Sequence, residues 1–171
     1  MMGAFKDADD RTKGEYVLSA LRIVLGFMLI WAFFDKLLGL GMQTTSEAAV
    51  INGGSPTEYY LSELVSGPFA GAFHAIAGNP LVDAALMAGL ILVGIGLMAG
   101  IASKLSTIGM CAMMALMYMR SILPSDNPVV DYHIVYILAI VAIYLLGGFG
   151  RLGLHGWWSR LGPVERHGIL H

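Results

Sequence analysis

Charged residues are scarce in this chain of 171 residues. Asp, Glu, Lys and Arg together make up 13% of it, hydrophobic residues make up 57%, and the mean hydropathy is +0.71. A soluble domain of this size cannot cover so much apolar surface with so few polar side chains. The composition therefore predicts an integral membrane protein.

Cysteine is almost absent as well, because Cys111 is the only one. A single thiol cannot form a disulfide within the chain, so an internal dithiol relay is excluded. The sequence also shows no convincing pair of haem ligands, and we expect no haem, flavin or metal. Any redox chemistry would then need a bound substrate or a partner protein.

The alternating ten-residue segments of an outer-membrane barrel are missing too. The chain has instead four apolar runs, at 17–34, 81–101, 105–123 and 129–146. Each is close to the roughly 20 residues that a helix needs to cross a bilayer. We predict an all-α polytopic membrane protein, one domain over 1–171. Its four transmembrane helices are expected at about 17–36, 80–101, 104–123 and 128–148, with tails at 1–15 and 151–171.

Lys and Arg are absent from two connecting segments, 37–80 and 121–128, and occur before the first run, between the second and third, and after the fourth. The positive-inside rule then places both termini in the cytoplasm, in a multi-pass protein of a cytoplasmic membrane. The first apolar run ends in Asp35-Lys36 without a small-residue cleavage site, so no cleaved signal peptide is expected.

The outer loop at 37–79 is long enough to carry structure of its own. Ser55-Pro56-Thr57-Glu58 is typical of a helix start, which predicts a short helix at 56–65 and a second one at 68–77. Four residues of this loop are available to line a site beneath it, namely Tyr59, Tyr60, Glu63 and His74. Aromatic residues of such loops are more often interface anchors.

Helices two and four open with the same phrase, Asn79-Pro80-Leu81-Val82-Asp83 and Asn127-Pro128-Val129-Val130-Asp131. The repeat suggests two related helical hairpins. Asn is a good cap, Pro suits the first helical position, and Asp favours the positive end of the helix dipole. This account suffices for Asp83 and weakens a functional interpretation of Asp131. In helix two, the Gly96-x-x-x-Gly100 pair predicts close helix packing.

The first helix carries several polar residues. Arg22 is available to serve a site, but we favour a side chain that extends back to the cytoplasmic headgroups. Trp31, Asp35 and Lys36 lie at the outer end, either as ordinary interface chemistry or as the start of a polar pocket.

In helix three, Met110, Met113, Met114 and Met117 form one stripe. Such a stripe is typical of a core or subunit interface, and it also suits a bulky apolar ligand such as a quinone ring. Arg120 follows at the outer end of this helix. An arginine on the outer side runs against the positive-inside rule, and this favours a functional pairing for Arg120.

Helix four places His133 and Tyr136 on one arc, whereas Asp131 is expected to project nearly opposite to His133. His133 is the better candidate for proton transfer because imidazole titrates near neutrality. Its alternative role is that of a hydrogen-bonded core residue.

Several of these segments together resemble the DoxX/DoxD family of membrane proteins. The resemblance rests on Leu21-Arg22 with Gly26 and Asp35-Lys36-Leu37, on the Gly67-Pro68-Phe69-Ala70-Gly71 loop up to Asn79-Pro80, and on Asn127-Pro128 through Asp131-Tyr132-His133 to Gly150-Arg151. It covers nearly the whole chain from Tyr16 to Trp158. It implies a four-helix bacterial or archaeal membrane protein. In the family, one member is the large subunit of a thiosulfate:quinone oxidoreductase that pairs with a DoxA subunit, and others are linked to oxidative-stress complexes.

The favoured hypothesis is a membrane subunit that oxidises a small sulfur anion such as thiosulfate and reduces quinone in an outer polar pocket. Quinone is its substrate, and a DoxA-like or other soluble redox subunit, a second copy and the bilayer are its expected partners, with no nucleic acid. The expected catalytic residues are His133, Asp35 and Arg120. The expected substrate-binding and quinone-binding residues are Trp31, Lys36, Tyr136, Met117 and Asp131.

The alternative is a non-enzymatic anchor that recruits soluble redox proteins. In that case the charged residues pair with one another to stabilise the bundle. A small transporter is a weaker possibility, since no charged residue lies at the bilayer midplane.

Overall fold

The structure is a computed structural model that describes residues 2–120, 122, 129–166 and 168–169. Within these ranges every regular element is helical, as predicted. The elements are α1 (Met2–Leu38), η1 (Val50–Asn52), α2 (Glu58–Glu63), α3 (Ala70–His74), α4 (Pro80–Ala99), α5 (Ser103–Arg120), α6 (Tyr132–Leu145), α7 (His155–Trp158) and α8 (Gly162–Arg166).

Two stretches are long and apolar enough to cross a membrane, Asp9–Leu38 within α1 and Pro80–Ala99, which is α4. Of the other two expected spans, α6 is apolar but has only 14 residues. α5 has 18 residues, and its hydropathy is lowered by Lys104 and Arg120 at its ends. The all-helical class and two candidate spans are thus established.

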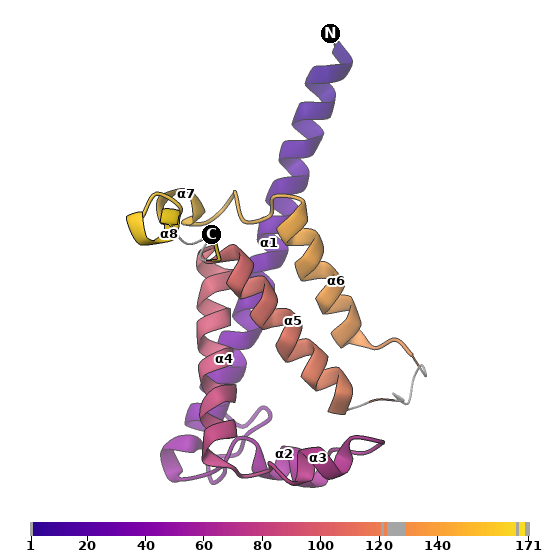
Figure 1. The fold of residues 1–171 in the computed structure, drawn as a ribbon, viewed down its shortest axis with the longest axis vertical. Coiled ribbons are helices and arrows are strands. Elements are labelled where there is room, and N and C mark those ends of the chain that lie inside the picture. The colour runs from indigo at the N-terminus through magenta and orange to yellow at the C-terminus, as the bar shows by residue number, and fades with distance from the viewer. Residues whose placement is uncertain (1, 121, 123–128, 167, 170–171) are drawn as a thin grey trace.

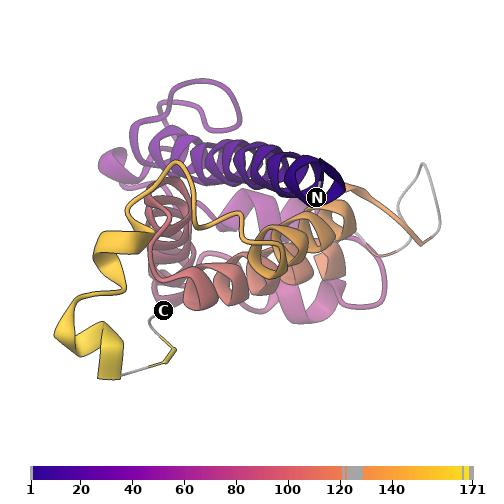
Figure 2. The same ribbon diagram turned by 90° about the horizontal axis from the view of Figure 1, so that it is seen from above.

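The four long helices run alternately up and down (Figure 1). α1 packs most extensively against α4, and α5 packs against α6. α5 and α6 lean away from α1 and α4 toward the end where α2 and α3 lie, while α7 and α8 lie at the other end (Figure 1). Seen from above, α5 and α6 stand beside one another on one side of α1 (Figure 2). The buried core joins all four long helices through Leu25, Leu29, Leu90, Leu97, Met110, Met114, Ile140 and Ile143.

Close packing of α1 and α4 depends on two glycines. A Cβ atom on Gly26 would lie 2.9 Å from the Gly94 carbonyl oxygen, and one on Gly94 would lie 3.2 Å from the Gly26 carbonyl oxygen. Within the predicted pair, Gly96 allows the close approach of another helix as expected, whereas Gly100 has a different role. Gly96 packs against Ser106 of α5, and Gly100 ends α4 with a φ of 69°, a left-handed conformation that favours glycine.

Arg22 does not extend to the headgroups, so that expectation is wrong. The side chain is fully buried, and its guanidinium group donates to the carbonyl oxygens of Leu97, Gly148 and Leu152, the last two at 3.1 and 2.9 Å. These carbonyls lie at or beyond the C-terminal ends of α4 and α6, where helices leave acceptors unsatisfied and favour a cation. Arg22 therefore joins the middle of α1 to the C-terminal ends of α4 and α6.

The first outer loop contains short helices where they were predicted, α2 and α3, although both are shorter than expected. The Ser55 hydroxyl accepts from the Glu58 N–H at 3.0 Å, as a helix cap does. Asp83 does more than interact with the helix dipole: its carboxylate accepts from the Thr57 hydroxyl at 2.5 Å and from the Thr57 N–H at 3.1 Å. Asp83 thereby holds the loop against the start of α4.

The largest differences from the predicted boundaries of the long helices are at the starts of α1 and α6. α1 begins at Met2, so residues 2–15, the predicted N-terminal tail, are helical and continuous with the first apolar run. α6 begins at Tyr132, later than the predicted 128. Asn79 caps α4 as expected, with its side chain accepting from the Leu81 N–H at 2.9 Å. The corresponding cap at Asn127 lies outside the described residues.

Candidate functional site

A cavity of about 420 Å³ lies among the four long helices on the side of α2. Its wall is largely apolar, and all four methionines of the predicted stripe contribute to it. Most of the predicted site residues line it. They are Trp31, Asp35, Lys36, Met117, His133 and Tyr136. The few polar side chains of this largely apolar cavity come from the end of α1, the start of α6 and the outer loop.

The cavity is lined by residues from α1, α4, α5 and α6, and also by the outer loop. Phe27, Trp31 and Lys36 come from α1, and Tyr132, His133 and Tyr136 come from α6. The loop adds Met42, Gln43 and Tyr60. The Tyr132 ring packs edge-on against Tyr136, with centroids 5.8 Å apart, and lies 4.1 Å from the His133 ring. Aromatic neighbours of this kind restrict the orientation of the imidazole.

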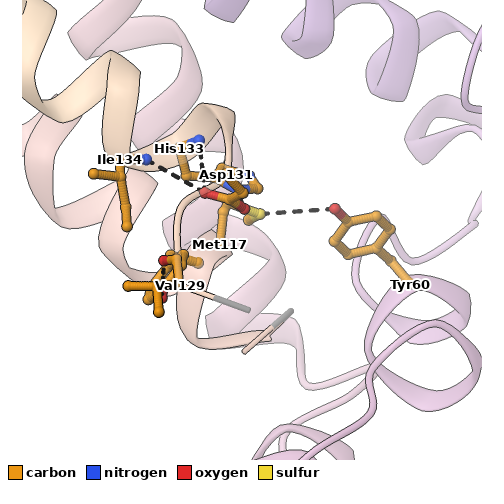
Figure 3. Close-up of polar contacts among 7 residues, drawn as sticks. Tyr60, Met117, Val129, Asp131, His133 and Ile134 are labelled. Atoms are coloured by element: carbon orange, nitrogen blue, oxygen red, sulfur yellow. Dashed lines mark hydrogen bonds and ion pairs between the residues drawn. The ribbon is translucent and has the colours of Figure 1, made fainter. Parts of the chain in front are cut away.

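His133 and Asp131 form a direct pair (Figure 3). The Asp131 Oδ2 atom lies 2.6 Å from His133 Nδ1, and the two side chains are only 9% and 5% exposed. The expectation that Asp131 projects away from His133 is wrong, because Asp131 is not helical: its φ of −125° and ψ of −177° are extended. It is the N-cap of α6, and its Oδ1 atom accepts from the His133 N–H at 2.9 Å and the Ile134 N–H at 3.4 Å.

This arrangement fixes the two nitrogens of the imidazole in different roles. The carboxylate of Asp131 accepts from Nδ1, whereas no described residue forms a hydrogen bond with Nε2. A carboxylate on Nδ1 orients the ring. Nε2 is therefore the imidazole nitrogen left for a ligand in the cavity that His133 lines.

Asp35 and Lys36 have different surroundings, although they are adjacent. The Asp35 carboxylate is 2% exposed and accepts from the Gln43 N–H at 3.0 Å and the Met42 N–H at 3.2 Å. It thus folds the chain back after α1. Lys36 has no carboxylate within ion-pair distance among the described residues, and its Nζ atom lies 5.9 Å from the centre of the Tyr60 ring. It is the only Lys or Arg in the cavity lining given for the described chain.

Tyr60 separates this cavity from two others, because it lines all three. Its hydroxyl group lies 3.8 Å from the sulfur atom of Met117 (Figure 3). The pKa of Tyr60 is raised, chiefly by burial and also by Tyr132, while the nearby Arg120 cation acts in the opposite direction. Tyr60 therefore remains a neutral phenol at physiological pH.

Arg120 does not line the cavity that contains Lys36 and His133. Its guanidinium carbon lies 4.3 Å from the centre of the Tyr60 ring, on the side of a second cavity of about 220 Å³. The expected convergence of Lys36, Arg120 and His133 on one chamber is thus correct for two of these residues and wrong for Arg120.

Comparison with known proteins gives no relative. No family model, curated protein or solved structure matches this chain. The chemistry of the cavity therefore has to follow from its own side chains. Among the described residues, no group of three His, Cys, Asp or Glu side chains is placed to hold a metal ion.

Some residues of the site could not be recognised from the sequence. Met42 and Gln43 line the cavity because their N–H groups donate to the Asp35 carboxylate, which folds the loop back. No local sequence pattern predicts these hydrogen bonds. The sequence places Tyr60 on a predicted loop helix but does not predict that it lines the cavity. Tyr132 is expected at the cavity once α6 is known to start there, because it is adjacent to His133.

Proposed function

We propose that this chain is the membrane subunit of a quinone-linked oxidoreductase of the DoxX/DoxD type, with four helices across a bacterial or archaeal cytoplasmic membrane and both termini inside. The up-and-down order of α1, α4, α5 and α6 supports this topology (Figure 1). So does the position of α7, whose Trp157 is 59% exposed at the end opposite the outer loop. α6 is about 21 Å long at 1.5 Å per residue, so the adjoining residues would complete its crossing.

The size and lining of the main cavity suit a quinone ring. Its volume of about 420 Å³ falls within the range of about 300–1,000 Å³ that is usual for ligand pockets. Flexible methionine side chains adapt to a flat apolar ring and its substituents. Polar groups, by contrast, are few and are concentrated around α6 and the end of α1.

The observation that carries this proposal is the buried Asp131–His133 pair beside an apolar chamber. A quinone, when bound, accepts two electrons and two protons. Asp131 holds Nδ1 of His133, and Nε2 is the ring nitrogen left to exchange a proton with an oxygen atom of a ligand in the chamber. The phenol of Tyr136 lines the same chamber and supplies a second O–H donor.

The proposed source of electrons is a small sulfur anion such as thiosulfate. Formation of one S–S bond between two such anions releases two electrons, which balances the reduction of one quinone. Lys36 is the cation in the described lining that would attract an anion to this end of the chamber. A DoxA-like or other soluble subunit is the proposed partner for this half of the reaction.

The experiment is an assay of quinone reduction by the purified chain, with thiosulfate as donor, in the presence and absence of a membrane extract as a source of partners. His133→Gln removes the titratable ring and is expected to lower turnover by about 100-fold. His74→Gln is the matched control, because His74 lies on α3 and outside the lining of the main cavity. Absence of quinone reduction in every preparation, or equal turnover of the two variants, would refute the proposal.

An anchor for soluble redox proteins is the second candidate. It is favoured by one observation: Asp35, Asp83 and Arg22 all hold backbone groups in place and have structural contacts of their own. If the anchor function is correct, His133→Gln leaves partner capture unchanged, and neither the wild-type chain nor a variant with a substitution in the cavity lining reduces quinone.

A further inference from the structure

The second cavity is chemically distinct from the first. It has a volume of about 220 Å³, and α2, α3, α4 and α5 provide its walls. Its lining is apolar apart from the polar side chains of Thr57, Tyr60 and Arg120. No acidic residue occurs in that lining as the described chain defines it.

Arg120 lies at this cavity with part of its hydrogen-bonding capacity unused. The Nε atom is buried and has no hydrogen-bond partner among the described residues. Nη1 makes one long contact, 3.4 Å, with the Leu64 carbonyl oxygen. Buried donors are almost always paired, so an unpaired guanidinium N–H group indicates that an acceptor is missing.

The stacked Tyr60 ring holds this guanidinium group in place. The centre of the ring lies 4.3 Å from the guanidinium carbon, a distance at which a cation is attracted to an aromatic face. The face of the cation is thereby satisfied, while its N–H edge remains available. That edge is the part of arginine that recognises carboxylate and phosphate oxygens.

We propose that the second cavity binds a single-chain anionic lipid, with its acyl chain in the apolar space and its carboxylate or phosphate group on Arg120. The volume is below the range of about 300–1,000 Å³ typical of whole ligands, so the cavity suits a chain segment rather than a substituted ring. The charge complementarity follows from the single cation and the absence of acids in the described lining. This site goes beyond the proposed quinone reaction and does not depend on it.

Binding is tested with the delipidated full-length chain in a neutral detergent, by native mass spectrometry. The probes are oleate, lysophosphatidylglycerol, lysophosphatidylcholine and inorganic phosphate. Oleate and lysophosphatidylglycerol carry a chain and a net negative charge, and they distinguish a carboxylate from a phosphate head. At least one of them is expected to bind one per chain, about tenfold more tightly than lysophosphatidylcholine. Phosphate without a chain is expected not to bind.

Two variants test the head-group contact and the acyl-chain space separately. Arg120→Gln is expected to weaken the anionic lipid by about tenfold, while the control Arg160→Gln, on an exposed residue outside the lining, leaves it unchanged. Ala85→Leu keeps the charge and fills the space, and it is expected to reduce binding of the lipid as strongly. Far-ultraviolet circular dichroism confirms that each variant is folded.

Three results would overturn the proposal. The first is equal binding of lysophosphatidylglycerol, oleate and lysophosphatidylcholine, which indicates nonspecific detergent-like association. The second is unchanged binding in both Arg120→Gln and Ala85→Leu. The third is displacement of the lipid by a short-chain quinone at equal concentration, which would assign the second cavity to the quinone site.

Discussion

Replacement of Asp131 separates two roles that the structure gives to one carboxylate. It caps α6 through the N–H groups of His133 and Ile134, and it pairs with His133 Nδ1 at 2.6 Å. Asparagine caps a helix about as well as aspartate does, but it carries no charge. Asp131→Asn therefore removes only the charge-assisted bond, whereas Asp131→Ala removes both functions.

The magnitudes follow from these contacts. A hydrogen bond to a charged group contributes about 1.5–3 kcal/mol, and both partners here are largely buried. Loss of an N-cap costs about 1 kcal/mol. Asp131→Asn is thus expected to lower the free energy of unfolding by about 1.5–3 kcal/mol, and Asp131→Ala by about 1 kcal/mol more. If the pair supports proton donation, each variant slows quinone reduction by about ten- to hundredfold.

Stability is measured by reversible unfolding in mixed micelles with increasing denaturing detergent, followed by circular dichroism. Turnover is measured on the same preparations. Equal stability of Asp131→Asn and Asp131→Ala would show that the side chain does not cap α6. Wild-type turnover in Asp131→Asn would show that the carboxylate has no part in proton donation.

Four further predictions concern other contacts. Arg22→Met leaves several buried carbonyl oxygens without a donor and should lower the free energy of unfolding in mixed micelles by at least about 3 kcal/mol; wild-type stability would contradict the buried position of this side chain. Gly94→Ala should destabilise by about 1–3 kcal/mol because its Cβ atom meets backbone atoms of α1, while Gly71→Ala, with open space around it, should not destabilise. Asp83→Ala should release the outer loop and increase its cleavage in limited proteolysis, and an unchanged cleavage rate would contradict the bonds to Thr57. Because the pKa of Tyr60 is raised in the folded state, the stability that this phenol contributes is present below about pH 10 and is lost as the pH rises through the higher folded pKa. The difference between the tyrosine absorbance titrations of wild type and Tyr60→Phe gives the pKa of Tyr60 in the folded protein, and a value at or below about 10 would contradict this prediction.

The sequence was sufficient for features that depend on local pattern. The helical class, the loop helices and the Asn79-Pro80 start of α4 follow from hydrophobic runs and capping preferences. The methionine stripe was placed on one face of α5, and the structure puts that face on the cavity. Local periodicity determines such features, because neighbouring turns of a helix share a face whatever the tertiary structure is.

Tertiary contacts determined the features that were missed. Arg22 was assigned to the headgroups because a long cationic side chain usually extends to water, yet here the ends of α4 and α6 supply carbonyl oxygens for it. Helical geometry would place Asp131 opposite His133, whereas α6 starts only at Tyr132 and leaves Asp131 extended. Arg120 was expected at the main cavity, and the position of Tyr60 on α2 puts it beside another. None of these contacts has a signature in the adjacent sequence.

The most direct test of the proposed function is photoaffinity labelling of the membrane-reconstituted chain with an azido-substituted quinone, followed by peptide mass spectrometry. We predict saturable labelling of the cavity residues Trp31, Met114 and Tyr136, removed by excess unlabelled quinone. Labelling confined to outward-facing residues such as Leu92 and Leu138, unaffected by competitor, would contradict a quinone site in this cavity.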